Sequence, residues 1–148
     1  MEDLSLHVLD LVDNCIAAGA SRIRVEVHED RRADRLRIRV ADNGRGMSRR
    51  VLRRAMDPLF TTKAGKNVGL GLSLFAQAAR ESGGHMEVRS LRGRGTDVCA
   101  EFGLSHIDRK PLGDLERTMR VVRVSHPEIE FEYNHTVGDE EGQHEAQA

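Results

Sequence analysis

The chain has 148 residues with 23 Lys and Arg against 24 Asp and Glu, a formal net charge of −1, and 39% hydrophobic residues. A globular chain of this length buries about 70% of the surface that its unfolded form exposes, which is enough for a core without disulfide or metal cross-links. With four Phe, one Tyr and no Trp, the core must be aliphatic, and RNA binding through aromatic stacking is disfavoured. The near-neutral charge also argues against a general nucleic-acid binder.

The cysteines, the histidines and the hydropathy favour a cytoplasmic protein without a zinc site. Cys15 and Cys99 each sit inside an apolar pattern, and we interpret both as reduced core residues. None of the seven histidines pairs with another His or Cys at zinc-like spacing, so we expect the histidines on the surface. No apolar run approaches the roughly 18 residues of a membrane span, and the N-terminus lacks the basic and apolar regions of a signal peptide.

Hydrophobic periodicity predicts the first elements along the chain. Apolar residues at helical spacing predict an amphipathic helix from Leu4 that Gly19 ends. Alternating apolar residues on either side of the polar turn 29–34 predict a β-hairpin with one buried face. After this hairpin, Ser48 can cap a short helix that runs to Met56.

The next part of the chain repeats the order of helix and hairpin. Segment 60–69 has no apolar period and is expected to be a mobile loop. Helical spacing resumes from Leu70 to Ser82, and a second hairpin is expected around the turn 92–95. This order of elements is typical of an α+β fold, a two-layer sandwich of one sheet with its helices on one face.

Three parts are expected along the chain. The elements above fill 1–104. Apolar residues between Pro111 and Tyr133 predict a further helix and strand, which we assign to a C-terminal α-β extension over 105–136. The remaining segment, 137–148, is acidic and Gln-rich with nothing to bury, so we expect it to be disordered.

Two clusters of polar residues could carry chemistry in the first half of the chain. On the predicted first helix, His7, Asp10 and Asn14 share one face. The carboxylate and the carboxamide could orient a water and ligate a hard metal, although a solvated polar face would show the same spacing. In the segment Asp42-Asn43-Gly44-Arg45-Gly46, the glycines allow close backbone approach and the carboxylate can accept a hydrogen bond from an amine. The alternative is an ordinary Gly-rich turn.

Two glycine-rich clusters follow in the second half. The stretch from Lys63 to Leu72 opens a helix, and its backbone N–H groups and helix dipole would attract anions such as phosphate. It is not a P-loop, because its lysines precede the closing glycines and no G-K-[ST] occurs. The last cluster, Gly93-Arg94-Gly95-Thr96, is either a hairpin turn or part of a site. Its hydroxyl matters only if Thr96 lies beside Asp42.

Taken together and in this order, the four clusters resemble the GHKL ATP-binding superfamily of DNA gyrase, Hsp90, MutL-type repair ATPases and sensor histidine kinases. Segment 9–20 is similar to the N box, 42–47 to the G1 box, 58–63 to the F box, 68–74 to the G2 box and 93–96 to the final glycine-threonine motif. The resemblance covers residues 1 to about 104. It implies the Bergerat-type ATP-binding fold, an α/β sandwich with a mixed sheet.

The resemblance also implies ATP and Mg²⁺ as cofactors, and it assigns roles to residues. Asn14 would coordinate the Mg²⁺ that bridges the phosphates. Asp42 would accept a hydrogen bond from the adenine amino group, with Thr96 supporting it. The remaining cofactor-binding residues would belong to the G1 turn, the hinge of an ATP lid and the phosphate-binding backbone: Gly44, Gly46, Met47, Phe60, Thr61, Thr62, Lys63, Lys66, Gly69, Leu70, Gly71 and Leu72.

Two positions help to compare the chain with the different branches of the superfamily. Asp10 stands where the gyrase, Hsp90 and MutL branch carries a glutamate as general base. It is one methylene shorter, and we take it as the expected catalytic residue. Ala17, three residues after Asn14, stands where kinases usually offer a basic side chain to the phosphates. The Phe-Thr-Thr-Lys and Gly-Leu-Gly-Leu-Ser-Leu segments nevertheless resemble histidine kinases more than gyrase.

Two hypotheses about function stay open. Because the predicted N-box helix begins within a few residues of Met1, we expect no dimerisation helix with a phospho-acceptor histidine ahead of it. The resemblance is therefore to small stand-alone ATP-binding proteins of bacteria. The first hypothesis is a Mg-ATP-binding, histidine-kinase-like domain that transfers phosphate to a protein partner in trans, or a slow ATPase whose nucleotide state drives a conformational or dimerisation change. The second is a binding regulator that holds ATP or ADP and sequesters a partner protein without productive chemistry.

Overall fold

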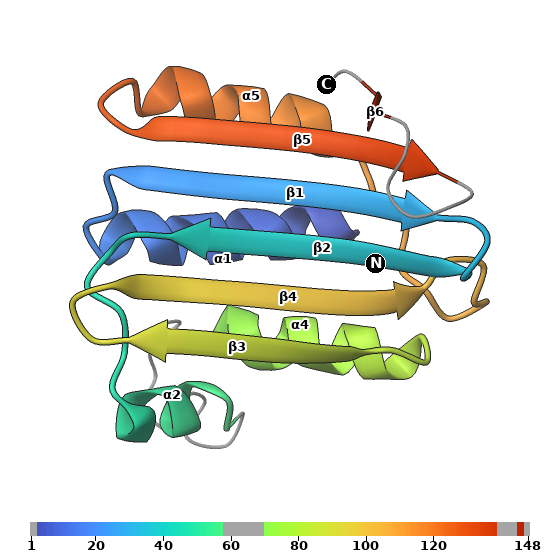
Figure 1. Ribbon diagram of the computed structural model, residues 1–148, viewed down its shortest axis with the longest axis horizontal. Helices are drawn as coiled ribbons and strands as arrows, with labels where there is room; N and C mark the ends of the chain where they lie inside the picture. Colours follow the sequence, from blue (N-terminus) through green and yellow to red (C-terminus); the bar gives the residue numbers. More distant parts are fainter. Residues whose placement is uncertain (1–2, 58–69, 139–144, 147–148) are drawn as a thin grey trace.

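A mixed six-stranded sheet forms one layer of the molecule, and helices cover one of its faces (Figure 1). The computed structural model describes residues 3–57, 70–138 and 145–146. The strand order is β3-β4-β2-β1-β5-β6, with β5 parallel to β1 and the other neighbours antiparallel. The α+β sandwich with a mixed sheet and helices on one face is therefore confirmed.

The first elements form where the periodicity predicts them. Helix α1 (Leu4–Ala17) begins at Asp3, whose carboxylate accepts from the Leu6 amide, and it is followed by Gly19 with φ of 77°. Strands β1 (Arg22–Asp30) and β2 (Arg35–Asp42) form the first hairpin, with alternate residues buried. Helix α2 (Arg49–Ala55) starts at Ser48, as expected, because the serine hydroxyl accepts from the Val51 amide.

The second helix and hairpin also follow the prediction. Helix α4 (Leu70–Glu81) is followed by β3 (His85–Leu91) and β4 (Gly95–Gly103). Strand β4 pairs with both β3 and β2, so the two hairpins join into one sheet. The predicted mobile loop, 60–69, lies outside the described residues.

The C-terminal extension continues the same sheet and core. Helix α5 (Leu115–Ser125) leads to β5 (Glu130–Gly138), which pairs with the whole of β1 in parallel. Met119 and Phe131 of the extension are buried with the residues of α1 and β1 in one core. A two-residue strand, β6 (Glu145–Ala146), pairs with β5. The expected disordered segment 137–148 is described only at 137–138 and 145–146, so its disorder stays a prediction.

The core lies between the sheet and the helices, and it is mainly aliphatic, as the composition requires. Its largest fully buried side chains include Phe75, Phe102, Leu4, Ile23 and Ile38. The two Phe rings meet edge to face with their centroids 5.5 Å apart, a favoured aromatic geometry.

The burial of two side chains differs from the prediction. His7 was expected on the surface but is only 3% exposed, because α4 packs against its side of α1 and places the Phe75 ring 6.0 Å from the imidazole. Cys99 was expected in the core, but it is half-buried on the open face of the sheet, since it alternates with the buried Val98 and Ala100. Cys15 is buried as expected, and both thiols are free.

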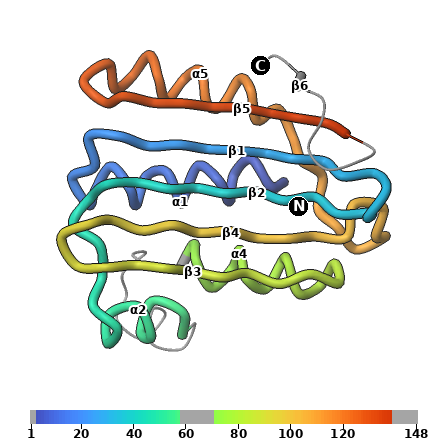
Figure 2. Tube along the Cα trace, in the orientation of Figure 1, coloured from blue at the N-terminus to red at the C-terminus, as the bar shows by residue number. Residues whose placement is uncertain are grey.

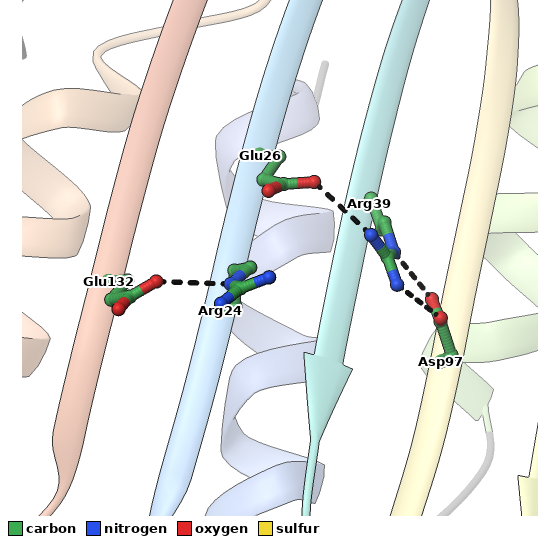
Figure 3. Close-up of polar contacts among 5 residues, drawn as sticks. All are labelled: Arg24, Glu26, Arg39, Asp97 and Glu132. Atoms are coloured by element: carbon green, nitrogen blue, oxygen red, sulfur yellow. Dashed lines mark hydrogen bonds and ion pairs between the residues drawn. The ribbon is translucent and has the colours of Figure 1, made fainter.

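The face of the sheet opposite the helices is polar, and its charges are paired across the strands. Figure 3 shows Arg39 between two carboxylates, with Nη2 at 2.7 Å from Asp97 and Nη1 at 3.4 Å from Glu26. Arg24 contacts Glu132 on β5 at 3.0 Å. These arginines therefore pair with carboxylates of the neighbouring strands. Among residues 3–57, 70–138 and 145–146, no helix is long and apolar enough to cross a membrane.

Candidate functional site

The candidate site is a pocket of about 240 Å³ at one end of the sheet. Its lining comes mainly from the C-terminal half of α1, the end of β2 and the turn after it, α2, and the start of β4. These segments lie at the left of Figure 1. Figure 2 shows that the loop after β2 and the β3–β4 turn reach the same end of the sheet. The pocket is mainly apolar and is lined by Leu11, Asn14, Cys15, Ala17, Ala18, Val40, Asp42, Arg45, Gly46, Met47, Val51, Ala55, Leu72, Thr96 and Val98.

Asp42 and Thr96 lie beside each other at the sheet end of this pocket. The register of β2 and β4 pairs these two residues directly, which meets the condition that the sequence left open for the Thr96 hydroxyl. The Asp42 carboxylate accepts from the Gly44 amide at 2.7 Å. Burial, together with the neighbouring Asp42 carboxylate, raises the pKa of the Cys15 thiol. The carboxylate is therefore fixed among buried neighbours in the pocket wall.

Ser90 holds the Thr96 hydroxyl in place, a role that the sequence pattern did not indicate. The Ser90 and Thr96 hydroxyls are 2.8 Å apart, and Ser90 Oγ accepts from the Met47 amide at 2.8 Å. This chain of hydrogen bonds connects β4, β3 and the G1 turn. It depends on the pairing of Ser90 with Thr96 in the sheet. The residue pattern of one strand does not show which residue of the next strand it will pair with.

The glycines of the G1 turn and of the final motif allow the chain segments to approach closely. A Cβ atom on Gly46, whose φ is +68°, would lie 2.0 Å from the Leu91 carbonyl oxygen. A Cβ atom on Gly95 would lie 2.0 Å from the carbonyl oxygen of Asp42, and one on Gly44 would lie 2.9 Å from that of Ala18. The glycines are therefore required by the packing of the backbone around the pocket.

The polar face of α1 meets the start of α4 on the other side of the pocket. Asn14 lines the pocket, and Asp10 lies one turn earlier on α1 with an exposed side chain. A Cβ atom on Gly71 would lie 3.3 Å from the Asp10 Cβ and 3.9 Å from the Asn14 Nδ2. The N-terminal end of α4, where the helix dipole is positive, therefore adjoins the predicted metal ligand and the predicted base.

Other predicted residues of the lid and the phosphate-binding backbone lie outside the described residues. These are Phe60, Thr61, Thr62, Lys63, Lys66 and Gly69. Leu70 begins α4, and Leu72 lines the pocket. Within the described ranges, no group of three or more His, Cys, Asp or Glu side chains could hold a metal ion. The predicted metal ligand, Asn14, lies in the pocket wall, and its role stays a prediction.

The fold is that of a known class of ATPase domains. The structure is similar to the Aquifex aeolicus MutL ATPase domain complexed with ADP, with a TM-score of 0.52 and 17% sequence identity over 99% of this chain and 64% of that chain. Residues 2–106 match the family of histidine kinase-, DNA gyrase B- and HSP90-like ATPases. The chain belongs to this family, which confirms the resemblance found in the sequence.

Two relatives of the chain are named as bacterial sensor proteins. The chain is 43% identical over 109 residues to the sensor protein kinase FleS of Pseudomonas aeruginosa, covering 74% of this chain and 26% of FleS. It is 31% identical over 109 residues to a putative sensor protein of Shewanella frigidimarina, covering 72% of this chain and 17% of that protein. The chain thus matches about a quarter or less of the length of these relatives.

Proposed function

We propose that this domain binds Mg-ATP in the pocket, with the adenine at the Asp42 end and the phosphates at the Asn14 end. The observation that carries the proposal is the arrangement of one mainly apolar pocket between two different polar ends. A carboxylate and a hydroxyl lie at one end, and a carboxamide beside a helix N-terminus lies at the other. This polarity matches a nucleotide, which is a flat base joined to an anionic chain.

At the base end, the Asp42 carboxylate would accept from the adenine amino group. The Gly44 amide already donates to one carboxylate oxygen at 2.7 Å, which fixes the side chain. The other oxygen would accept from the ligand. Val40 and Val98, next to this pair on β2 and β4, line the pocket and would pack against the base. An apolar wall with a few convergent polar groups is the usual form of a small-molecule site.

At the phosphate end, the Asn14 amide oxygen would be one ligand of Mg²⁺, with the remaining ligands from phosphate oxygens and water. When bound, the ion would neutralise the charge of the phosphates. The amides of Leu70, Gly71 and Leu72 at the start of α4 would donate to phosphate oxygens, because a helix N-terminus presents unpaired N–H groups. The placement of Phe60, Thr61 and Lys63 in the hinge of an ATP lid stays a prediction, because these residues lie outside the described part of the chain.

Asp10 is the residue that we propose for the chemistry. Its exposed side chain lies beside Gly71 and one helical turn from Asn14. In a slow ATPase, the Asp10 carboxylate would accept a proton from the attacking water. In phosphotransfer to a partner protein, it would orient the acceptor group, and catalysis would come mainly from positioning and electrostatics.

One observation favours a second candidate, a nucleotide-dependent regulator without productive chemistry. Asp10 is not among the described residues that line the pocket, and its side chain is one methylene shorter than a glutamate. A carboxylate that cannot reach the water would leave a domain that binds ATP and responds to its state by changing its affinity for a partner protein.

The test is Mg-ATP turnover by the purified protein and its Asp10→Asn variant, with nucleotide binding measured in both. Asp13→Asn is the matched control, because Asp13 is exposed on the same helix and does not line the pocket. Turnover by the wild type and the control, together with binding but no turnover by Asp10→Asn, would establish the ATPase with Asp10 as base. Binding without turnover in all three would favour transfer to a partner or the regulator. Absence of nucleotide binding by the wild type would refute the proposal.

A further inference from the structure

Arginines gather at one edge and end of the sheet, around α2 and the β3–β4 turn. Segments 43–57 and 88–96 together contain eight arginines and one carboxylate, Asp57, in a chain with 23 basic and 24 acidic residues. Helix α2 packs beside β3 (Figure 1). The Gly93 amide donates to the Arg45 carbonyl at 2.6 Å, which ties the β3–β4 turn to the turn before α2. An excess of positive charge is therefore concentrated at this corner of the molecule.

Five of these arginines are exposed and, in the described part of the chain, form no ion pair with a carboxylate. They are the α2 residues Arg49, Arg50 and Arg53 and the turn residues Arg92 and Arg94, which we call the arginine surface. The arginines of the open sheet face in Figure 3 differ, because each of them contacts a carboxylate of a neighbouring strand. The charge of the arginine surface is thus left for a partner outside the described chain.

Helix α2 carries its arginines at positions that weaken it. Arg49 and Arg53 are four residues apart, as are Arg50 and Arg54, and like charges at this spacing repel each other along a helix. The first turn contains no acidic residue, so Arg49 and Arg50 lie at the positive end of the helix dipole without compensation. A negatively charged partner would relieve this repulsion.

The surroundings of these arginines favour an acidic protein segment over a bilayer or a nucleic acid. Leu91 is 65% exposed at the end of β3, directly before Arg92, and it offers an apolar contact. Val51 and Ala55 line the pocket, so α2 directs apolar side chains to the pocket rather than to a bilayer. The rest of the chain has more acidic than basic residues, which would repel a long polyanion such as duplex DNA beyond the arginine surface.

We propose that the arginine surface is a docking site for an acidic segment of a partner protein, with Leu91 in contact with an apolar side chain of that segment. The guanidinium groups would bind its carboxylates through paired N–H donors, a geometry that arginine provides and lysine does not. A docked segment would lie beside the pocket, because α2 contributes to both. The inference concerns an outer surface and does not depend on the proposed nucleotide binding.

The test measures binding of a fluorescent synthetic peptide of Asp and Glu with one central Leu, by anisotropy without nucleotide. At about 0.1 M salt, charges more than roughly 10 Å away are largely screened. The wild type should bind the peptide, and the double variant Arg49→Gln with Arg53→Gln should raise the dissociation constant about tenfold. Because the substitutions remove like-charge repulsion, the double variant should be at least as stable in urea as the wild type.

The matched control is the double variant Arg117→Gln with Arg120→Gln. It removes the same charge from exposed positions of α5, which lies by the opposite edge of the sheet (Figure 1). Because these positions are remote from the arginine surface, the control should change the dissociation constant less than about twofold.

A further comparison separates a protein segment from other anions. Leu91→Ser, at an exposed position, should weaken binding of this peptide but not of a peptide with Ser in place of its Leu. No binding by the wild type, equal losses in the two double variants, or equal binding of the two peptides by the wild type would overturn the inference. Tighter binding of a labelled DNA duplex or of phosphatidylglycerol vesicles, lost in the α2 variant, would assign the surface to nucleic acid or to a bilayer and overturn it as well.

Discussion

Replacing Asp42 by asparagine should weaken ATP binding while leaving the fold intact. The substitution keeps the size of the side chain, but one acceptor oxygen becomes an NH₂ donor. Because the Gly44 amide donates to the carboxylate at 2.7 Å, the asparagine oxygen should stay on Gly44 and the NH₂ group should face the pocket. The adenine amino group, itself a donor, would then meet a donor. A buried donor left without its acceptor costs about 1–3 kcal/mol, which corresponds to a dissociation constant raised about 5- to 150-fold.

Calorimetric titration of wild type and variant with ATP measures this loss directly. A nucleotide with a carbonyl oxygen at the 6-position, such as GTP, should lose less affinity, because the new NH₂ group can donate to that oxygen. Asp97→Asn is the control, since Asp97 pairs with Arg39 on the open face of the sheet, away from the pocket. An unchanged affinity for ATP in Asp42→Asn, with the fold intact, would refute the placement of the adenine.

Three further predictions address the packing, the open face of the sheet and the pocket thiol. Gly46→Ala places a Cβ atom 2.0 Å from the Leu91 carbonyl oxygen at a φ of +68°, so the free energy of unfolding in urea should fall by at least about 2 kcal/mol, and an unchanged value would show that the turn can shift. Arg39→Ala removes two hydrogen bonds to Asp97, of 2.9 and 2.7 Å. It should cost only about 0.5–1 kcal/mol because the pair is partly exposed, and less at high salt. Cys15 should alkylate slowly at pH 8 and still more slowly with ATP, as followed by mass spectrometry, because its raised pKa keeps the thiol protonated. Rapid labelling would contradict its burial.

The individual helices and strands could be predicted from the sequence because the apolar residues of each recur with the period of a helix or of a strand. The alternation of Ile23, Val25 and Val27 specifies a strand with one buried face, and the structure buries all three. The partner of β5 could not be predicted in this way. β5 pairs with β1 from Glu130 opposite Arg22, and a parallel pair between distant segments leaves no mark on the period of either strand.

The candidate site was predictable as a set of motifs but not as a geometry. From the sequence, Thr96 was expected to matter only if it lies beside Asp42. The structure shows that it does, because β2 and β4 are neighbours in the sheet and their register pairs these two residues. The contact of Ser90 with Thr96 was missed because it crosses between two strands. His7 was misplaced because the spacing of α1 alone does not show which flank a second helix will cover.

The two ends of the pocket differ in how much change they can tolerate. At the base end, backbone carbonyls lie so close to Gly46 and Gly95 that any side chain there would displace the G1 turn or β4. At the phosphate end, Asp10 and Ala17 are exposed on α1, where a substitution costs little folding free energy. Both departures from the superfamily pattern lie at this second end. With the nucleotide bound as proposed, recognition of the base would therefore be tied to the stability of the fold. The proposed chemistry at the phosphates would instead depend on exposed side chains of one helix, which can change without disturbing the sheet.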